Sequence, residues 1–186
     1  MLPRSAIAGL QIITMSFTNI EIKARTVSVD AIRSFLLQQN ARVVGTDMQT
    51  DTYFNCAKGR LKLRQGSIEN SLIFYERENV AGPRASSFEL VPVTDGAALL
   101  KLLTRAHGIK VQVVKQREIF YIDNVKFHLD RVEGLGTFVE IEAGNVLKDV
   151  PVEMLQEQCA FYVNAFEIKE GDMLAVSYSD MLLSKV

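Results

Sequence analysis

Apolar and polar side chains alternate along several short segments, which is the pattern of strands with one dry and one wet face. Between Asn19 and Arg25, polar or charged residues occupy every second position, and apolar residues fill the positions between them. Similar alternation marks the segments 60–64, 72–77, 115–117, 125–130 and 139–142. The sequence therefore predicts an antiparallel sheet with one strongly charged face.

Turn signals and helical patterns separate these strands. Asp123-Asn124 predicts a hairpin, and Gly134 and Gly136 interrupt the chain before the last strand. Helices are predicted over 28–39 with Ser28 as cap, from Thr94 to a stop at Gly108, over 151–164 behind Pro151, and over 173–183. Strands in hairpins with inserted helices indicate an α+β domain with an antiparallel sheet.

The composition fits one globular domain without nucleic-acid character. The 186 residues are 48% hydrophobic and 23% charged, with a formal net charge of −1. A chain of this length can bury a core of its own. Because no global basic field would attract nucleic acid, any site for an anion must be a local concentration of Lys and Arg.

The cysteines and the N-terminus bear on location and domain limits. Cys56 and Cys159 belong to no metal-binding spacing and are predicted to be free thiols in a cytoplasmic protein. No apolar run is long enough to predict a membrane span. Residues 1–15 are interpreted as an extension before a domain over 16–186, and either Met1 or Met15 fits as the natural start.

The charges on the polar face are sorted by sign. Arg60, Lys62 and Arg64 share one strand face, whereas Glu140 and Glu142 share another. One interpretation is an ordinary solvated sheet face. The other is an enclosed site, in which a polyanion and its cations offset the repulsion within each group. On this second interpretation, replacing either glutamate by alanine would abolish turnover and leave the fold intact or more stable.

A triphosphate with a divalent cation matches these side chains. Guanidinium groups bind phosphate oxygens in pairs, and lysine adds a point charge. Carboxylates such as Glu21, Glu140 and Glu142 are hard ligands suited to Mg²⁺ or Mn²⁺. Among the histidines, His107 is predicted to lie on the surface, and a structural role is favoured for His128 over a catalytic one. There is no phosphate loop and no dinucleotide-binding glycine pattern.

The order of these motifs resembles the CYTH superfamily, which joins class IV adenylate cyclases, thiamine triphosphatases and inorganic triphosphatases. The motif NIEIKAR at 19–25 matches the family's E-x-E-x-K strand, except that Asn19 stands in place of the first glutamate. The further matches are QTDTYF (49–54), GRLKLR (59–64), LIFYER (72–77), VKQR (114–117), LDRVEGLG (129–136), FVEIE (138–142) and YSDMLL (178–183).

The resemblance implies an eight-stranded antiparallel barrel with a charged lumen, the triphosphate tunnel fold, with helices packed outside. It implies that Lys62, Arg64, Arg77, Lys115 and Arg117 hold phosphates and that Asp130 supports a basic residue. Arg25 and Arg60 join the predicted triphosphate-binding set from the charged strand faces. Glu21, Glu140 and Glu142 are the expected ligands of Mg²⁺ or Mn²⁺. Lys23 and Tyr53 match a lysine and a tyrosine that orient the attacking water in triphosphatase members.

The family resemblance leaves the reaction open. In a cyclase, the 3′-hydroxyl of ATP attacks the α-phosphorus and yields cyclic AMP and pyrophosphate. In a triphosphatase, water attacks the terminal phosphorus of an inorganic, thiamine or nucleoside triphosphate. Loss of a carboxylate at Asn19 favours a third alternative, a non-catalytic module that binds triphosphate or polyphosphate. The family also suggests a homodimer.

Overall fold

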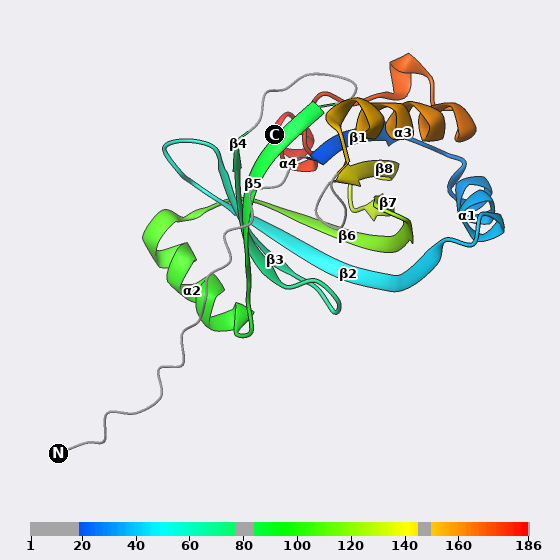
Figure 1. Cartoon of the computed structure of the whole chain (residues 1–186). Coiled ribbons are helices and arrows are strands. Elements are labelled where there is room, and N and C mark those ends of the chain that lie inside the picture. The colour runs from blue at the N-terminus through cyan, green and yellow to red at the C-terminus, as the bar shows by residue number, and fades with distance from the viewer. Residues whose placement is uncertain (1–18, 77–83, 145–149, 186) are drawn as a thin grey trace.

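Eight antiparallel strands close into a barrel in the computed structural model, which describes residues 19–76, 84–144 and 150–185, with side chains for all of these except 84–88 (Figure 1). The strand order around the barrel is β1-β5-β4-β3-β2-β6-β7-β8. The strands are β1 (Asn19–Arg25), β2 (Arg42–Phe54), β3 (Arg60–Gln65), β4 (Ser71–Glu76), β5 (Arg84–Pro92), β6 (Ile109–Ile122), β7 (Val125–Val132) and β8 (Gly136–Gly144). The predicted α+β class and the eight-stranded barrel are confirmed.

Within the described residues, four α-helices lie outside the strands. They are α1 (Val29–Gln38), α2 (Gly96–His107), α3 (Val152–Ala165) and α4 (Tyr178–Leu183), with a 3₁₀ turn at Glu170–Asp172. Helix α3 packs across β1 and β8, and α2 packs against β2 and β3. None of the described helices combines the length and the apolar character of a membrane span.

Two helix starts differ from the sequence prediction. Helix α2 is capped by Asp95 and not by Thr94, because the Asp95 carboxylate accepts a hydrogen bond from the Ala98 amide at 2.9 Å. Helix α4 begins at Tyr178, later than predicted, because Met173 forms a β-bridge with Ala24. Helical geometry therefore starts only after the chain has passed β1.

Along β1, the apolar side chains face outward from the barrel and the charged side chains face its interior. Ile20, Ile22 and Ala24 are at most 2% exposed and belong to a core cluster between the outer face of the barrel and helices α1 and α3. Glu21 and Lys23 point the other way and line a cavity. Burying the apolar face under helices contributes about 25 cal/mol per Å² of apolar surface, so the helices hold the charged face inward.

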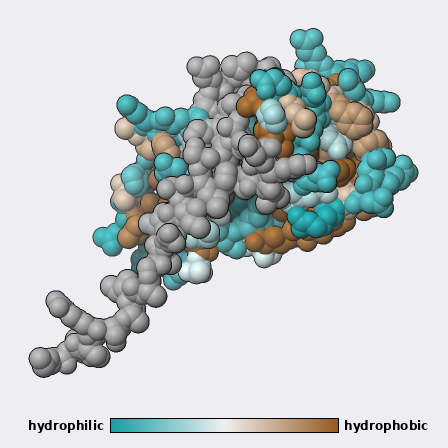
Figure 2. All heavy atoms as spheres, viewed as in Figure 1, coloured by the Kyte–Doolittle hydropathy of each residue, from teal (hydrophilic) through white to brown (hydrophobic). Residues whose placement is uncertain are grey.

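The outer face of β2 is left partly uncovered. Its exposed apolar side chains are Val43, Val44 and Met48. Figure 2 shows hydrophobic side chains along the lower edge of the visible face, over β2, whereas most of the described surface in that view is hydrophilic. Residues 1–15, and with them the choice between Met1 and Met15 as the start, lie outside the described residues.

Candidate functional site

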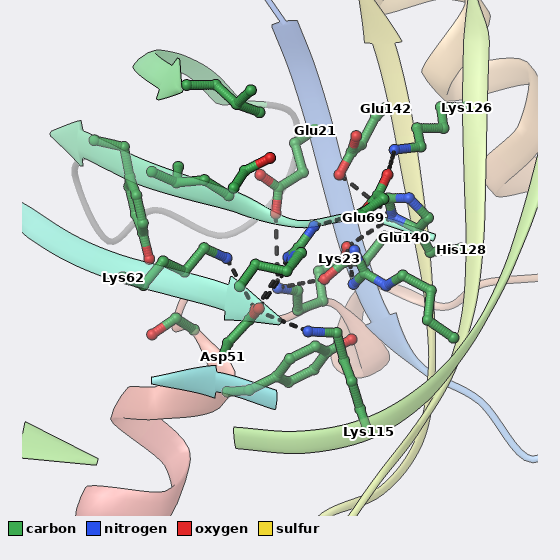
Figure 3. A pocket seen from close by; sticks show the side chains of 18 of the residues that line it. Glu21, Lys23, Asp51, Lys62, Glu69, Lys115, Lys126, His128, Glu140 and Glu142 are labelled. Carbon is green, nitrogen blue, oxygen red and sulfur yellow. Dashed lines mark hydrogen bonds and ion pairs between the residues drawn. The ribbon is translucent and has the colours of Figure 1, made fainter. Parts of the chain in front are cut away.

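A cavity of about 380 Å³ lies inside the barrel, and charged side chains from most of the strands line it (Figure 3). Alternation places these side chains on the inner face of each strand. Of the predicted site residues, the cavity brings together Glu21, Lys23, Tyr53, Lys62, Arg64, Lys115, Arg117, Glu140 and Glu142. The volume falls within the range of about 300–1,000 Å³ that is usual for small-molecule sites.

Asp51 is the centre of the basic side of the cavity. Its carboxylate accepts hydrogen bonds from Arg64 Nε at 2.8 Å, Lys115 Nζ at 2.8 Å and Lys62 Nζ at 3.1 Å. Burial by itself would raise the pKa of Asp51, but the charges of Arg64, Lys115 and Lys62 outweigh it and hold the pKa well below its usual range. One ionised carboxylate therefore keeps three cations close together.

Lys115 is a cation whose pKa is lowered by burial. Its side chain is 1% exposed, and burial lowers its pKa to about 7, although the attraction of Asp51 opposes this shift. The charges of Arg64 and Arg117 also lower it. The basic side of the cavity thus holds more positive charge than Asp51 neutralises, and an anion of higher charge would relieve the imbalance.

Glu140 is the centre of the opposite side. Lys23 Nζ lies 2.6 Å from Oε1 of Glu140, and Arg117 Nη2 lies 2.7 Å from Oε2. His128 Nδ1 is 3.1 Å from the same Oε2. These partners hold the pKa of Glu140 well below its usual range against the effect of burial. Since Glu140 is surrounded by cations, the expectation that an alanine at this position would relieve repulsion is wrong for Glu140.

Asp130 is hydrogen-bonded to a basic residue of the lumen, Arg117. It is 1% exposed and receives hydrogen bonds from Arg117 Nε at 2.7 Å and from the Tyr178 hydroxyl at 2.8 Å. Asp130 does not itself line the cavity, so it orients the Arg117 guanidinium from behind. Negative charge on both sides raises the pKa of Arg117 further, despite its burial.

Helix α4 closes one end of the cavity. The Tyr178 ring lies 4.1 Å from Lys23 Nζ, and its centroid lies 4.9 Å from that of Phe138. Tyr53 and Met181 belong to the same buried apolar cluster. The charged cavity therefore ends at an aromatic side chain, Tyr178, on the side of α4.

His128, Glu140 and Glu142 form the group that could hold a metal ion. One ligand atom from each lies within 4.8 Å of the others. Glu21 is the cross-strand partner of Glu142 on β1, but it lies outside this compact group, and its Oε1 is 3.7 Å from Lys23 Nζ. Contact with His128 and the charge of Lys126 outweigh burial and lower the pKa of Glu142 to about 2, so an anionic oxygen is present at neutral pH.

The donor set fits a hard divalent cation better than zinc, because two of its three members are carboxylates and no cysteine is present. Glu140 is already held by Lys23 and Arg117, whereas Glu142 keeps 23% of its side chain exposed. Glu142 is therefore the carboxylate most available to an incoming ion.

Two predicted phosphate-binding arginines of the described residues, Arg25 and Arg60, do not line the cavity. Arg25 is exposed, donates to the carbonyl of Leu135 at 3.1 Å and stacks on Phe138, because it lies past the level at which α4 closes the barrel. Arg60 is bound by Asp180 of α4 at 2.9 Å, at the same closed end. Arg77 lies outside the described residues.

Several residues of the cavity were not predicted as site residues. Asp51 binds the basic cluster, and Glu69 and Lys126 line the cavity as a hydrogen-bonded ion pair. The sequence does contain a pattern that could have identified Asp51. Every second position of β2 from 47 to 53 is polar or aromatic: Asp47, Gln49, Asp51 and Tyr53. No such pattern marks Glu69, because it belongs to the connection between β3 and β4.

Comparison with known proteins places these features in context. A family model described as the CYTH domain matches residues 18–163. A solved protein of Pyrococcus horikoshii is 23% identical with a TM-score of 0.74, and the match covers 87% of this chain and 98% of that one. A proposed adenylate cyclase of Vibrio parahaemolyticus is 20% identical with a TM-score of 0.73, covering 90% and 99%.

A third similar structure is a Hippeastrum protein, proposed as an adenylyl cyclase and described as having a dominant triphosphatase activity. It is 14% identical with a TM-score of 0.63, and the match covers 92% of this chain and 96% of that one. At these identities the three structures demonstrate a shared fold. No curated protein matches the chain.

Proposed function

This chain belongs to the CYTH domain family, and on that premise we propose that it is a divalent-metal-dependent enzyme that cleaves a phosphoanhydride bond of a triphosphate. One observation carries the proposal: Lys62, Arg64 and Lys115 converge on an enclosed cavity whose opposite wall holds His128, Glu140 and Glu142. A solvated sheet face would not enclose such groups, since burying charges away from water is costly unless they are paired.

The basic side of the cavity would bind the phosphate chain. Arg64 presents a planar fork, and Lys62 and Lys115 add charge from the neighbouring strands. Asp51 keeps the three groups converged before the substrate arrives, so little reorganisation is needed on binding. Arg117, fixed from behind by Asp130, would contact the phosphates from the opposite side.

Lys23 and Tyr53 are the proposed catalytic residues. Lys23 Nζ lies between Glu140 and Glu21 and would position a nucleophile or a phosphoryl oxygen. Burial and the charge of Asp51 raise the pKa of Tyr53 to about 12, so its phenol stays protonated and can donate a hydrogen bond. Glu142 and Glu21 would hold Mg²⁺ or Mn²⁺ together with Glu140, and a bound divalent ion neutralises phosphoryl charge that develops during transfer.

Two reactions fit the same set of residues. In class IV cyclase-like chemistry, the ribose 3′-oxygen of ATP forms a bond to the α-phosphorus and pyrophosphate leaves. In hydrolysis, a water oxygen forms a bond to the terminal phosphorus and the shortened phosphate chain leaves. The similar Vibrio and Hippeastrum proteins are both described as proposed adenylate cyclases, and the Hippeastrum protein is also described as having a dominant triphosphatase activity. In this chain, the pair of Lys23 and Tyr53 favours hydrolysis.

The products separate these reactions. The purified protein is incubated with ATP, thiamine triphosphate or tripolyphosphate and with Mg²⁺ or Mn²⁺. Cyclic AMP with pyrophosphate identifies a cyclase, and release of orthophosphate identifies a triphosphatase. Tight binding of tripolyphosphate without turnover under every condition would replace the enzyme proposal with a binding module. Absence of both binding and turnover would refute the assignment to triphosphates.

A further inference from the structure

An ion pair spans the barrel from one wall to the opposite one. Glu69 precedes β4, and its Oε1 lies 2.6 Å from Lys126 Nζ on β7 (Figure 3). In the strand order, three strands separate β4 from β7 in either direction, so the two walls face each other across the lumen. Both residues line the cavity. The contact is therefore a bar across the space that a ligand would occupy.

The backbone around Glu69 is firmly held. The buried Asp47 carboxylate accepts hydrogen bonds from the amides of Ile68 and Glu69, both at 2.9 Å, and from the Ser67 hydroxyl at 2.9 Å. A Cβ on Gly66 would lie 2.6 Å from the Asp47 oxygens, so the close approach requires glycine there. Only the Glu69 side chain is therefore expected to move when the bar opens.

Glu69 also binds Arg64, one of the cations of the basic cluster. Its Oε2 accepts a hydrogen bond from Arg64 Nη1 at 2.8 Å, while Asp51 binds Nε and Nη2 of the same guanidinium. Lys126 stays charged, because Glu142 and Glu69 raise its pKa although burial opposes this. Glu69 thus neutralises two cations of the lumen, Arg64 and Lys126, with one carboxylate.

We propose that Lys126 is a further phosphate-binding residue, and that Glu69 is an internal carboxylate which the substrate's phosphates displace from Lys126 and Arg64. The inference rests on the proposed function. A phosphate chain presents more charge and more acceptor oxygens than one carboxylate, so exchange of partners is favourable for both cations. Binding of the substrate's phosphates and loss of the Glu69–Lys126 ion pair are then one event.

The opposing interpretation is a strut that only stiffens the barrel. The two interpretations differ in the sign of one effect. Removing the charge of a competitor strengthens the binding of phosphate, whereas removing a strut weakens it or leaves it unchanged. Glu69→Gln preserves the shape of the side chain and removes its charge. Glu118→Gln is the matched control, since Glu118 pairs with Arg33 outside the cavity.

The test is calorimetric titration of each variant with tripolyphosphate at low salt and without metal. Glu69→Gln is expected to lower Kd roughly tenfold, and Lys126→Met to raise it roughly tenfold, because each changes one charge beside the anion. In the Lys126→Met background, the gain from Glu69→Gln should shrink to about threefold or less. Glu118→Gln should bind as the wild type does.

Two outcomes would overturn the inference: no gain in affinity for Glu69→Gln, or an equal gain with and without Lys126. If Glu69→Gln does not fold, Glu69→Ala replaces it, since it also removes the competing carboxylate and a gain in the same direction is expected. If the wild type binds tripolyphosphate and Glu69→Gln binds it with the same Kd, this inference fails but the proposed function stands. Failure of the folded wild-type chain to bind tripolyphosphate both without metal and with Mg²⁺ or Mn²⁺ refutes both.

Discussion

Asp51 on β2 and Lys115 on β6 form a buried ion pair, with 2.8 Å between Oδ2 and Nζ and with neither side chain more than 3% exposed. The same carboxylate binds Lys62 and Arg64. Asp51 therefore supplies the negative charge that permits three cations to be buried together.

The first prediction concerns the stability of this cluster. Asp51→Asn should lower the free energy of unfolding by about 3–5 kcal/mol, because it leaves buried cations without their counter-charge. Tripolyphosphate should restore part of that loss by replacing the missing charge. Urea denaturation with and without tripolyphosphate measures both effects. Asp30→Asn, at an exposed carboxylate paired with Arg33, is the control and should be nearly neutral.

The second prediction concerns proton uptake. Burial lowers the pKa of Lys115 to about 7, and a bound phosphate chain should raise it again. Binding at pH 8 should therefore take up a proton in the wild type but not at this position in Lys115→Met. Calorimetry in two buffers of different ionisation enthalpy counts the protons. Equal counts in the two proteins would contradict the role of Lys115, and Lys110→Met should behave as the wild type.

Lys115 has a related effect on stability. Its pKa in the folded protein, about 7, lies below the ordinary value of 10.5, so the unfolded chain binds more protons between these two pH values. The contribution of Lys115 to stability should therefore rise with pH across this window. Urea denaturation at pH 7 and pH 9 measures it as a steeper rise in the wild type than in Lys115→Met.

The third prediction separates arginines inside and outside the cavity. Arg64→Ala should raise the Kd for tripolyphosphate about 10- to 100-fold, since a hydrogen bond to a charged group contributes about 1.5–3 kcal/mol. Arg25→Ala should leave Kd unchanged, because Arg25 binds the Leu135 carbonyl beyond the closed end. Titration of both variants, with circular dichroism as the folding check, decides the matter. Equal losses would mean that the ligand binds elsewhere.

The fourth prediction concerns the metal. Glu142→Gln should weaken the binding of Mn²⁺ in the presence of tripolyphosphate by at least about tenfold, because it removes the most accessible charged ligand. Electron paramagnetic resonance of free Mn²⁺ gives the affinity without relying on turnover. Glu133→Gln, at an exposed carboxylate in the β7–β8 turn, should match the wild type. Unchanged Mn²⁺ binding in Glu142→Gln would remove Glu142 from the ligand set.

Local alternation was enough to group several candidate residues on the strand faces that line the cavity. Because successive side chains of a strand point to opposite faces, the sequence itself puts Lys62 with Arg64 and Glu140 with Glu142 on one face each. The ordered motifs then identified the barrel, and the family model matches the same region of the chain. These features depend on neighbours within a few residues, which a sequence displays directly.

Only the closed barrel decided which charged positions meet. Arg25 shares the face of Lys23, yet α4 covers the lumen between them and leaves Arg25 outside. Glu69 belongs to no strand pattern and reaches Lys126 because β4 and β7 stand on opposite walls. The depth of a residue along the lumen and its partner across it follow from closure and from helix packing. Both depend on contacts between segments far apart in the chain, which periodicity does not encode.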